Sequence, residues 1–176
     1  MSRQVVATPY RAGVAPTPLT IRPLTGPAEF PALIEIWRGA VEATHDFLDE
    51  ADRQAIEVGM RDEYLHAVTV SVADSGAGPV GFSGVAGQKL EMLFIAESAR
   101  GTGIGTTLLR HAISEFDVSK VDVNEQNTQA LGFYEHHGFV VVGRSETDDA
   151  GRPYPILHLS RQGYLPSEIR TRIGVV

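Results

Sequence analysis

The chain of 176 residues contains no cysteine. This absence excludes disulfides, cysteine nucleophiles and zinc sites built from thiolates. No stretch approaches the ~18 consecutive apolar residues that a membrane-spanning helix requires, so we expect no membrane partner. Arg3 and Arg11 are not followed by a continuous apolar segment, which disfavours a secretory signal peptide. A cytoplasmic protein is the simplest expectation.

Basic residues are also scarce, with 15 Lys and Arg against 22 Asp and Glu and a formal net charge of −7. No basic stripe is present, so we expect no nucleic-acid partner. An anionic cofactor remains compatible with this charge, because backbone amides and one arginine can build a local positive site. The negative charge itself favours a cationic acceptor. Hydrophobic residues make up 43% and charged residues 21%, which is typical of a globular domain.

A strand, a glycine-rich turn and a helix are predicted in succession near the middle of the chain. The apolar run 92–96 indicates a buried strand, and apolar residues from Ile104 to Ile113 recur at helical spacing. Between them lies Arg100-Gly-Thr-Gly-Ile-Gly105. The first turn of a helix carries unpaired N–H groups and the positive end of the helix dipole. Because glycines let a bulky anion approach, we expect a phosphate here; a turn that only connects strand to helix is the alternative.

The residues around these glycines distinguish between kinds of phosphate loop. A P-loop requires Gly-Lys-Ser/Thr after the glycines, whereas Ile104, Gly105 and Thr106 follow Gly103. A dinucleotide loop would have a third glycine where Thr106 stands. The stretch matches instead the pattern Arg/Gln-x-x-Gly-x-Gly/Ala, through Arg100, Gly103 and Gly105. In this it resembles the coenzyme A pyrophosphate loop of the GNAT N-acetyltransferase superfamily.

Hydrophobic periodicity over the whole chain predicts elements in the order β-α-α-β-β-β-α-β-α-β-β. Strands are predicted at 19–24, 66–73, 80–85, 92–96, 120–123, 139–142 and 154–159. Helices are predicted at 28–43 and 49–65, after Gly105, and from 124–127 to a stop at Gly138. The order predicts an α/β (α+β) fold with a central, mostly antiparallel mixed sheet of about seven strands and about four flanking helices. We expect a flexible N-terminal arm at 1–17, one domain at 18–161 and a C-terminal tail at 162–176.

A second stretch of the sequence resembles the same superfamily as the glycine-rich turn. The segment Val121-x-Val123-x-x-x-Asn127-x-x-Ala130-x-x-Phe133-Tyr134-x-x-x-Gly138-Phe139 resembles the second GNAT motif, and its distance from Arg100 is that of the family. The predicted order of elements is also that of the GNAT fold. The short pieces 43–48, 124–127, 143–146 and 151–155 further resemble the bacterial YjaB-type subgroup. The resemblance covers about 19–160.

This resemblance implies an acetyl-CoA-dependent N-acetyltransferase that transfers acetyl to a primary amine by direct attack in a ternary complex. Leu93, Phe94 and Ile95 match the strand whose backbone pairs with the pantetheine arm. Asn127 matches a contact to the same arm, and Tyr134 matches the tyrosine that protonates the departing thiolate. The pyrophosphate would be held by Arg100, Gly101, Thr102, Gly103, Ile104, Gly105 and Thr106. The acceptor would be a small-molecule or peptide amine, and many relatives form homodimers.

The chemistry of acyl transfer agrees with these assignments. A tyrosine with an ordinary pKa near ~10 is protonated at neutral pH and can act as a general acid. Backbone N–H groups can polarise the thioester carbonyl. For the general base we favour Glu91, which strand alternation would place on the face of Leu93 and Ile95. The alternatives are His45, Asp46, Glu125 and a water chain.

Several of these residues also have plain structural explanations. Tyr134 could be a core tyrosine, because it lies on the apolar face of its predicted helix. Asn127 could act only as a helix N-cap, a role that is compatible with ligand contact. His111, His136 and His137 suggest a metal site, but His136 and His137 are adjacent and point apart on a helix. We therefore expect solvated or core histidines and no metal.

The acceptor site is expected on two further segments. His45, Asp46 and Phe47 lie between two predicted helices, where the family places its acceptor site, and Tyr154 lies near the same side. A helix connection rich in Asp and His is also ordinary, so the alternative of no contact stays open.

A non-catalytic acetyl-CoA binding or sensing module is the alternative function, since it would keep the same loop. A small-molecule binding domain without coenzyme A is a third, in which the loop at Arg100 is incidental.

Overall fold

The fold is built on one seven-stranded mixed sheet. The computed structural model describes residues 18–161 and 163, so the predicted arm and the rest of the predicted tail lie outside the described residues. The strands lie in the order β1-β2-β3-β4-β5-β7-β6, and β4 and β5 are the parallel pair. They are β1 (Thr20–Pro23), β2 (Thr69–Asp74), β3 (Pro79–Ala86), β4 (Lys89–Ile95), β5 (Lys120–Asn124), β6 (Phe139–Ser145) and β7 (Ile156–Arg161). The predicted mostly antiparallel sheet is confirmed.

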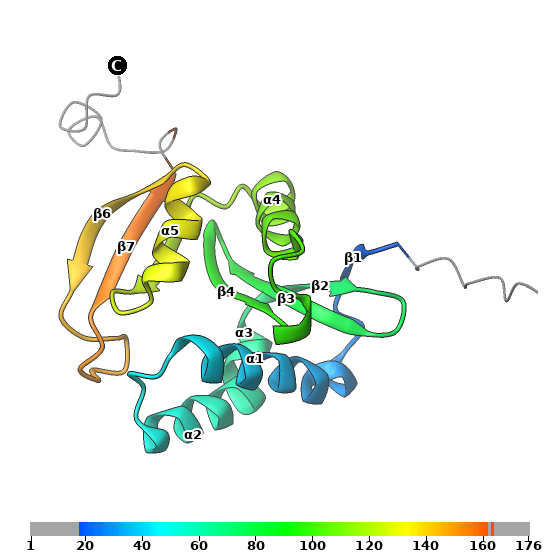
Figure 1. Ribbon diagram of the computed structural model, residues 1–176, viewed down its shortest axis with the longest axis horizontal. Helices are drawn as coiled ribbons and strands as arrows, with labels where there is room; N and C mark the ends of the chain where they lie inside the picture. The colour runs from blue at the N-terminus through cyan, green and yellow to red at the C-terminus, as the bar shows by residue number, and fades with distance from the viewer. Residues whose placement is uncertain (1–17, 162, 164–176) are drawn as a thin grey trace, which may run out of the picture.

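Helices cover both faces of this sheet (Figure 1). Helices α1 (Phe30–Thr44) and α2 (Glu50–Gly59) lie together on one side of β2–β4, and α4 (Ile104–Phe116) lies on the other. Helix α5 (Thr128–His136) lies against β6 and β7. Short helical segments occupy Pro27–Glu29, Met60–Tyr64, Leu65–Ala67 (α3) and Glu97–Ala99. Among the described residues, no helix combines the length and apolar character needed to cross a membrane.

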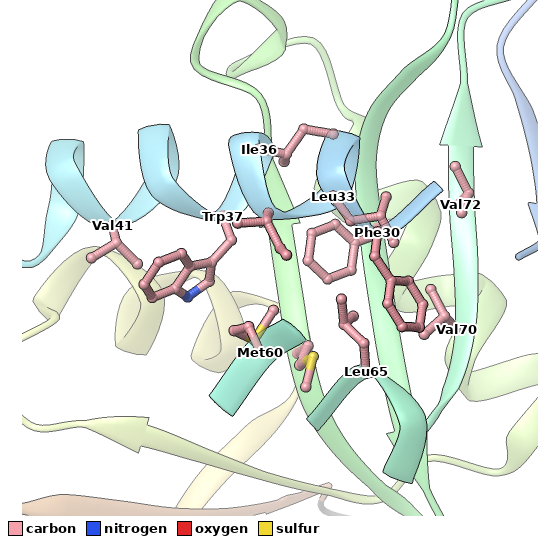
Figure 2. Packing of buried hydrophobic residues seen from close by; sticks show 12 residues of the cluster. Phe30, Leu33, Ile36, Trp37, Val41, Met60, Leu65, Val70 and Val72 are labelled. Atoms are coloured by element: carbon pink, nitrogen blue, oxygen red, sulfur yellow. The ribbon is translucent and has the colours of Figure 1, made fainter. Parts of the chain in front are cut away.

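One apolar cluster fixes α1 against the sheet (Figure 2). Leu33, Trp37 and Val41 recur every four residues, so they form one inward-facing stripe of the helix. Figure 2 shows this stripe directed toward Met60 and Leu65 of the following helical segments. Trp37 is 2% exposed and is therefore a core residue. The same helix contacts β3 and β4, so this packing positions the C-terminal end of α1 beside the sheet.

A second cluster holds α4 and α5. Leu109 and Ala112 of α4 are fully buried and belong to one cluster with Val121 and Val123 of β5. Tyr134 of α5 belongs to the same cluster. Full burial of a valine or leucine side chain contributes about 1.5–3 kcal/mol, so apolar contact dominates the placement of both helices. Their N-terminal ends open on the same cleft as a result.

The sheet splits between β4 and β5. In the part of the chain that the structure describes, these strands pair through Lys89 with Lys120 and Leu90 with Val121, and no further pairs follow. Beyond Leu90 the strands separate. The backbone groups on this edge of β4 are therefore open to a ligand.

A β-bulge interrupts β4 at the start of this open edge. Across β3, Val85 pairs with Leu90 and Gly84 pairs with Met92, so Glu91 is an extra residue. A bulge disturbs the regular alternation of side chains between the two faces of a strand. The predicted face of Glu91 assumed unbroken alternation, so its place relative to Leu93 stays a prediction at this point.

Two predicted boundaries differ from the structure for identifiable reasons. The strand expected from residue 66 begins at Thr69, because the second helix continues through a π-helical turn at Met60–Tyr64 and then α3. The helix expected to start within 124–127 begins at Thr128. Asn127 is its N-cap, and the Asn127 side chain accepts a hydrogen bond from the Ala130 N–H.

Candidate active site

A cleft of about 450 Å³ lies where the sheet splits. Residues of β4, of the C-terminal end of α1 and of the N-terminal ends of α4 and α5 form its walls. Thr102 does not line it; its hydroxyl donates to the Ala99 carbonyl at 2.6 Å and closes the turn. The predicted site residues that line the cleft are His45, Leu93, Phe94, Ile95, Arg100, Gly101, Gly103, Ile104, Gly105, Thr106, Asn127 and Tyr134.

The glycine-rich turn forms one end of this cleft. Gly101 and Gly103 have φ of 74° and 86°, in the left-handed region that favours glycine. Gly103 is the N-cap of α4 and supplies no capping side chain, so within the described residues the N–H groups of Ile104 to Thr106 have no protein partner. A Cβ on Gly101 or Gly103 would meet no atom within 4 Å. The turn is thus an open, uncapped cradle that fits a pyrophosphate.

Helix α5 holds two side chains of this end of the cleft. The Arg100 guanidinium donates to Gln129 Oε1 at 2.7 Å. Thr106 Oγ1 lies 3.2 Å from His137 Nε2, and His137 Nδ1 lies 2.8 Å from the Phe133 carbonyl oxygen. Because a carbonyl can only accept, a neutral His137 carries its proton on Nδ1 and receives the Thr106 hydroxyl proton at Nε2. His137 therefore ties α4 to α5, a role that the sequence did not reveal.

Asn127 combines its two predicted roles in one place. Its Oδ1 atom accepts the Ala130 N–H at 3.0 Å, which confirms the N-cap explanation. The residue also lines the large cleft. The cap uses the carbonyl oxygen of the side chain, so the amide nitrogen is available to a ligand. Contact with the pantetheine arm stays a prediction.

Tyr134 lies where the large cleft meets a smaller one of about 120 Å³. It is 7% exposed, and its ring contacts those of Phe133 and Phe139. Burial raises the pKa of its phenol well above the ordinary value. The residue is therefore part of the core and also presents a protonated side chain to both clefts.

The smaller cleft carries two carboxylates. Glu91 and Asp122 line it, and the Lys89 ammonium lies 3.1 Å from Glu91 Oε2 and 2.9 Å from Asp122 Oδ2. Burial lowers the pKa of Lys89, but hydrogen bonds and charge attraction from Asp122 and Glu91 outweigh it and raise the pKa above its ordinary value. Asp122 Oδ1 also lies 2.8 Å from His158 Nδ1. Sequence reasoning missed Asp122, although a carboxylate between two buried valines of β5 was a readable signal.

His45 lines both clefts at the C-terminal end of α1. Its Nδ1 atom lies 2.7 Å from Thr44 Oγ1, and this hydroxyl donates to the Ala40 carbonyl oxygen at 2.7 Å. Burial lowers the pKa of the imidazole, and the neighbouring Asp46 carboxylate partly opposes this shift. A neutral imidazole therefore faces the junction of the clefts at neutral pH.

The other predicted acceptor residues belong to a contact between two loops. The Tyr154 hydroxyl donates to Asp52 Oδ2 at 2.6 Å and accepts the Asp49 N–H at 3.0 Å. Its ring centroid lies 6.2 Å from that of Phe47. We call this contact between residues 45–52 and Tyr154 the loop latch. Asp46, Phe47 and Tyr154 do not line either cleft. The Tyr154 hydroxyl is already hydrogen-bonded to other residues of the protein.

The connected clefts combine groups suited to acyl transfer. An anion cradle lies at one end, an open strand edge along the wall, and a phenol and an imidazole at the junction. A phosphate-bearing acyl carrier fits the first two features, and proton transfer fits the others. Within residues 18–161 and 163, no group of three or more His, Asp or Glu side chains could hold a metal ion.

Comparison with known proteins agrees with this geometry. A family model described as "Acetyltransferase (GNAT) domain" matches residues 37–154. The peptidyl-lysine N-acetyltransferase YjaB of Salmonella typhimurium is 48% identical over 128 residues, which cover 72% of this chain and 88% of the relative. The solution structure of apo-form YjaB from Escherichia coli has 43% identity and a TM-score of 0.74, and the match covers 81% of this chain and 96% of that chain.

A more distant structure shares the fold alone. The PaiA N-acetyltransferase of Thermoplasma acidophilum, solved in complex with coenzyme A, has 22% identity and a TM-score of 0.63 over 80% of this chain and 98% of that chain.

The family match includes both the glycine-rich turn and Tyr134, so it covers the whole cofactor cleft. The chain belongs to the GNAT acetyltransferase family and is an acetyl-CoA-dependent N-acetyltransferase.

Proposed function

We propose that this enzyme acetylates the side-chain amine of lysine in peptides or proteins. The observation that carries the proposal is the junction of two clefts at Tyr134, of which the larger ends in the anion cradle. Glu91 and Asp122 line the smaller one, and the Lys89 ammonium pairs with both, so one net negative charge remains there and favours a cationic side chain. The relative that is 48% identical is named a peptidyl-lysine N-acetyltransferase, which supports the same acceptor.

The large cleft would hold the cofactor along the open edge of β4. The uncapped N–H groups of the first turn of α4, together with Arg100, would bind the pyrophosphate. The backbone of Leu93 to Ile95 would pair with the pantetheine arm, because β5 has separated from this edge. The Asn127 amide nitrogen would contact the same arm. When bound, acetyl-CoA supplies the acetyl thioester on which the amine acts.

Tyr134 would act as the general acid. Its raised pKa keeps the phenol protonated at neutral pH, so a proton is available for the departing thiolate. Open backbone N–H groups of β4 would polarise the thioester carbonyl. The chain contains no cysteine to carry an acetyl group, which favours direct attack by the amine in a ternary complex. Glu91 is one candidate for the base that deprotonates the amine, and His45 is another.

A thiol-release assay with a lysine-containing peptide tests the proposal. We expect release of coenzyme A thiol to depend on this peptide, and mass spectrometry to place the acetyl group on the lysine Nε. A matched peptide with that Nε already acetylated should give no release above background. Transfer to small amines alone would exclude a peptidyl-lysine acceptor. Binding of acetyl-CoA without transfer to any amine would indicate a binding or sensing module.

A further inference from the structure

We propose that His45 is the general base that takes the proton from the acceptor amine. This inference rests on the proposed function, because it assigns a residue to one step of that transfer. Two features of the structure carry it: the imidazole lies at the junction of the two clefts, and its hydrogen bonds leave Nε2 free.

The two walls of the junction carry different titratable groups. Among the residues that line both clefts, His45 and Tyr134 are the ones whose side chains titrate. His45 follows α1, and Tyr134 belongs to α5. Acyl transfer to an amine needs one group that accepts a proton and another that donates one. The junction supplies this pair from two separate elements.

The hydrogen bonds of Thr44 determine which imidazole nitrogen is the base. The Thr44 hydroxyl has one proton, and it donates that proton to the Ala40 carbonyl oxygen at 2.7 Å. Thr44 Oγ1 therefore accepts from His45 Nδ1, which lies 2.7 Å away and must carry the N–H. In the neutral ring the lone pair is then on Nε2. Within the described part of the chain, Nε2 has no hydrogen-bond partner, so it is free to accept a proton from a substrate.

Burial favours the basic form of this ring at neutral pH. It lowers the pKa of His45 below the ordinary value of 6.5, although Asp46 acts in the opposite direction. The imidazole is therefore neutral and able to accept a proton at pH 7. The other titratable groups around the junction are Lys89 and Glu91 of β4, Asp122 of β5 and Tyr134 of α5.

The two carboxylates of the small cleft are already engaged by cations or hydrogen-bond donors. Both oxygens of Asp122 have partners, because Oδ1 contacts His158 and Oδ2 contacts Lys89. Glu91 Oε2 contacts the same Lys89 ammonium. His45 Nε2, by contrast, has no hydrogen-bond partner within the described residues. The role of base is therefore assigned to His45 and not to either carboxylate.

The transfer balances with these two residues. The acceptor ammonium first gives one proton to solvent water. The neutral nitrogen then forms a bond to the acetyl carbon, and the carbon–sulfur bond breaks with its electron pair on sulfur. The proton lost by nitrogen goes to His45 Nε2, and the phenolic proton of Tyr134 goes to sulfur. Solvent then takes the proton from His45 and returns one to Tyr134. No oxidant, reductant or metal enters this balance.

Replacing His45 tests the assignment. In His45→Ala we expect kcat to fall by about 10²–10⁴-fold, the range usual for loss of a general base. The acetyl-CoA Kd, measured by calorimetry, should not change. Added imidazole should restore part of kcat in His45→Ala but not in His45→Gln. In the wild-type enzyme kcat should fall as the pH drops through the His45 pKa, and this acid limb should be absent from His45→Gln.

Two further variants make the result specific. Thr44→Val removes the acceptor for the Nδ1 proton and should lower kcat with little change in KM. His111→Gln on α4, outside both clefts, is the matched control and should retain wild-type kcat. The proposal would be overturned if both His45 variants kept the wild-type kcat and only raised the acceptor KM. It would also be overturned if Glu91→Gln alone lost kcat together with the fall in kcat at low pH. If the wild-type enzyme itself transfers acetyl to no lysine peptide, the proposed function fails instead.

Discussion

Replacing Tyr154 with phenylalanine should loosen the loop latch and leave the cofactor cleft intact. The substitution removes one hydroxyl, while the ring still fills the space beside Phe47. That hydroxyl joins two segments that lie 102 residues apart in sequence, at Asp52 and Tyr154. Because the Phe47 ring also lies 5.2 Å from the His45 ring, a looser latch should disturb the acceptor side of the site.

The two hydrogen bonds of the hydroxyl set the size of the effect. A bond to a charged group, such as the 2.6 Å bond to Asp52, is worth about 1.5–3 kcal/mol. The 3.0 Å bond from the Asp49 N–H is worth about 0.5–1.5 kcal/mol. The Asp52 side chain is 31% exposed and also faces Arg152, so water and Arg152 compensate part of the loss. We expect a loss of about 2 kcal/mol, which lowers Tm by roughly 4–8 °C in a domain of this size.

Thermal unfolding followed by circular dichroism measures this loss. Tyr64→Phe is the matched control, because within the described residues the Tyr64 hydroxyl forms no hydrogen bond. Steady-state kinetics should show a raised acceptor KM in Tyr154→Phe, with the acetyl-CoA Kd unchanged. Equal Tm values for the two variants, together with unchanged kinetics, would refute the latch.

Three further predictions concern the acid, the anion cradle and stability at low pH. Tyr134→Phe should lower kcat by about 10²–10⁴-fold and leave the calorimetric acetyl-CoA Kd unchanged, and an undiminished kcat would exclude Tyr134 as the acid. Gly103→Ala forces a Cβ into the left-handed region at a cost of roughly 1–2 kcal/mol, so it should lower Tm and weaken acetyl-CoA binding, whereas Gly132→Ala in α5 should do neither. Hydrogen bonds from Arg22 lower the pKa of Glu29 from 4.5 to about 2, so its stabilising contribution is present above pH 4.5 and lost as the pH falls toward 2. Urea unfolding should therefore show a weaker pH dependence over this window in Glu29→Gln, and an unaltered dependence would contradict the assignment.

Local sequence patterns predicted most of the fold and the cofactor end of the site. Helical spacing from Ile104 and the apolar run before it lie within one short stretch, so the strand, turn and helix follow from neighbouring residues. The positive φ of Gly101 and Gly103 agrees with the open turn that their lack of a Cβ suggested. Asn127 as an N-cap is a similarly local interaction, three residues from its partner Ala130.

Interactions between distant segments could not be predicted in this way. The bulge at Glu91 arises from the register of β4 on β3, and no pattern within β4 shows it. The latch depends on a contact between Tyr154 and Asp52 of α2, which lie 102 residues apart in the sequence. The proton position on His45 depends on a single hydroxyl, Thr44, whose partner could not be known before the helix end was seen. The acceptor side of the site is made of such contacts, so the sequence could name candidate residues there but not the contacts that position them.

Quantified acetyl transfer to a lysine peptide tests the account most directly. Wild-type enzyme, acetyl-CoA and the peptide should yield coenzyme A thiol and Nε-acetyl-lysine in equal amounts. Gly103→Glu, which places a carboxylate in the anion cradle, should yield neither and should bind acetyl-CoA weakly. Thiol release that is independent of the peptide, or full transfer by Gly103→Glu, would contradict the account.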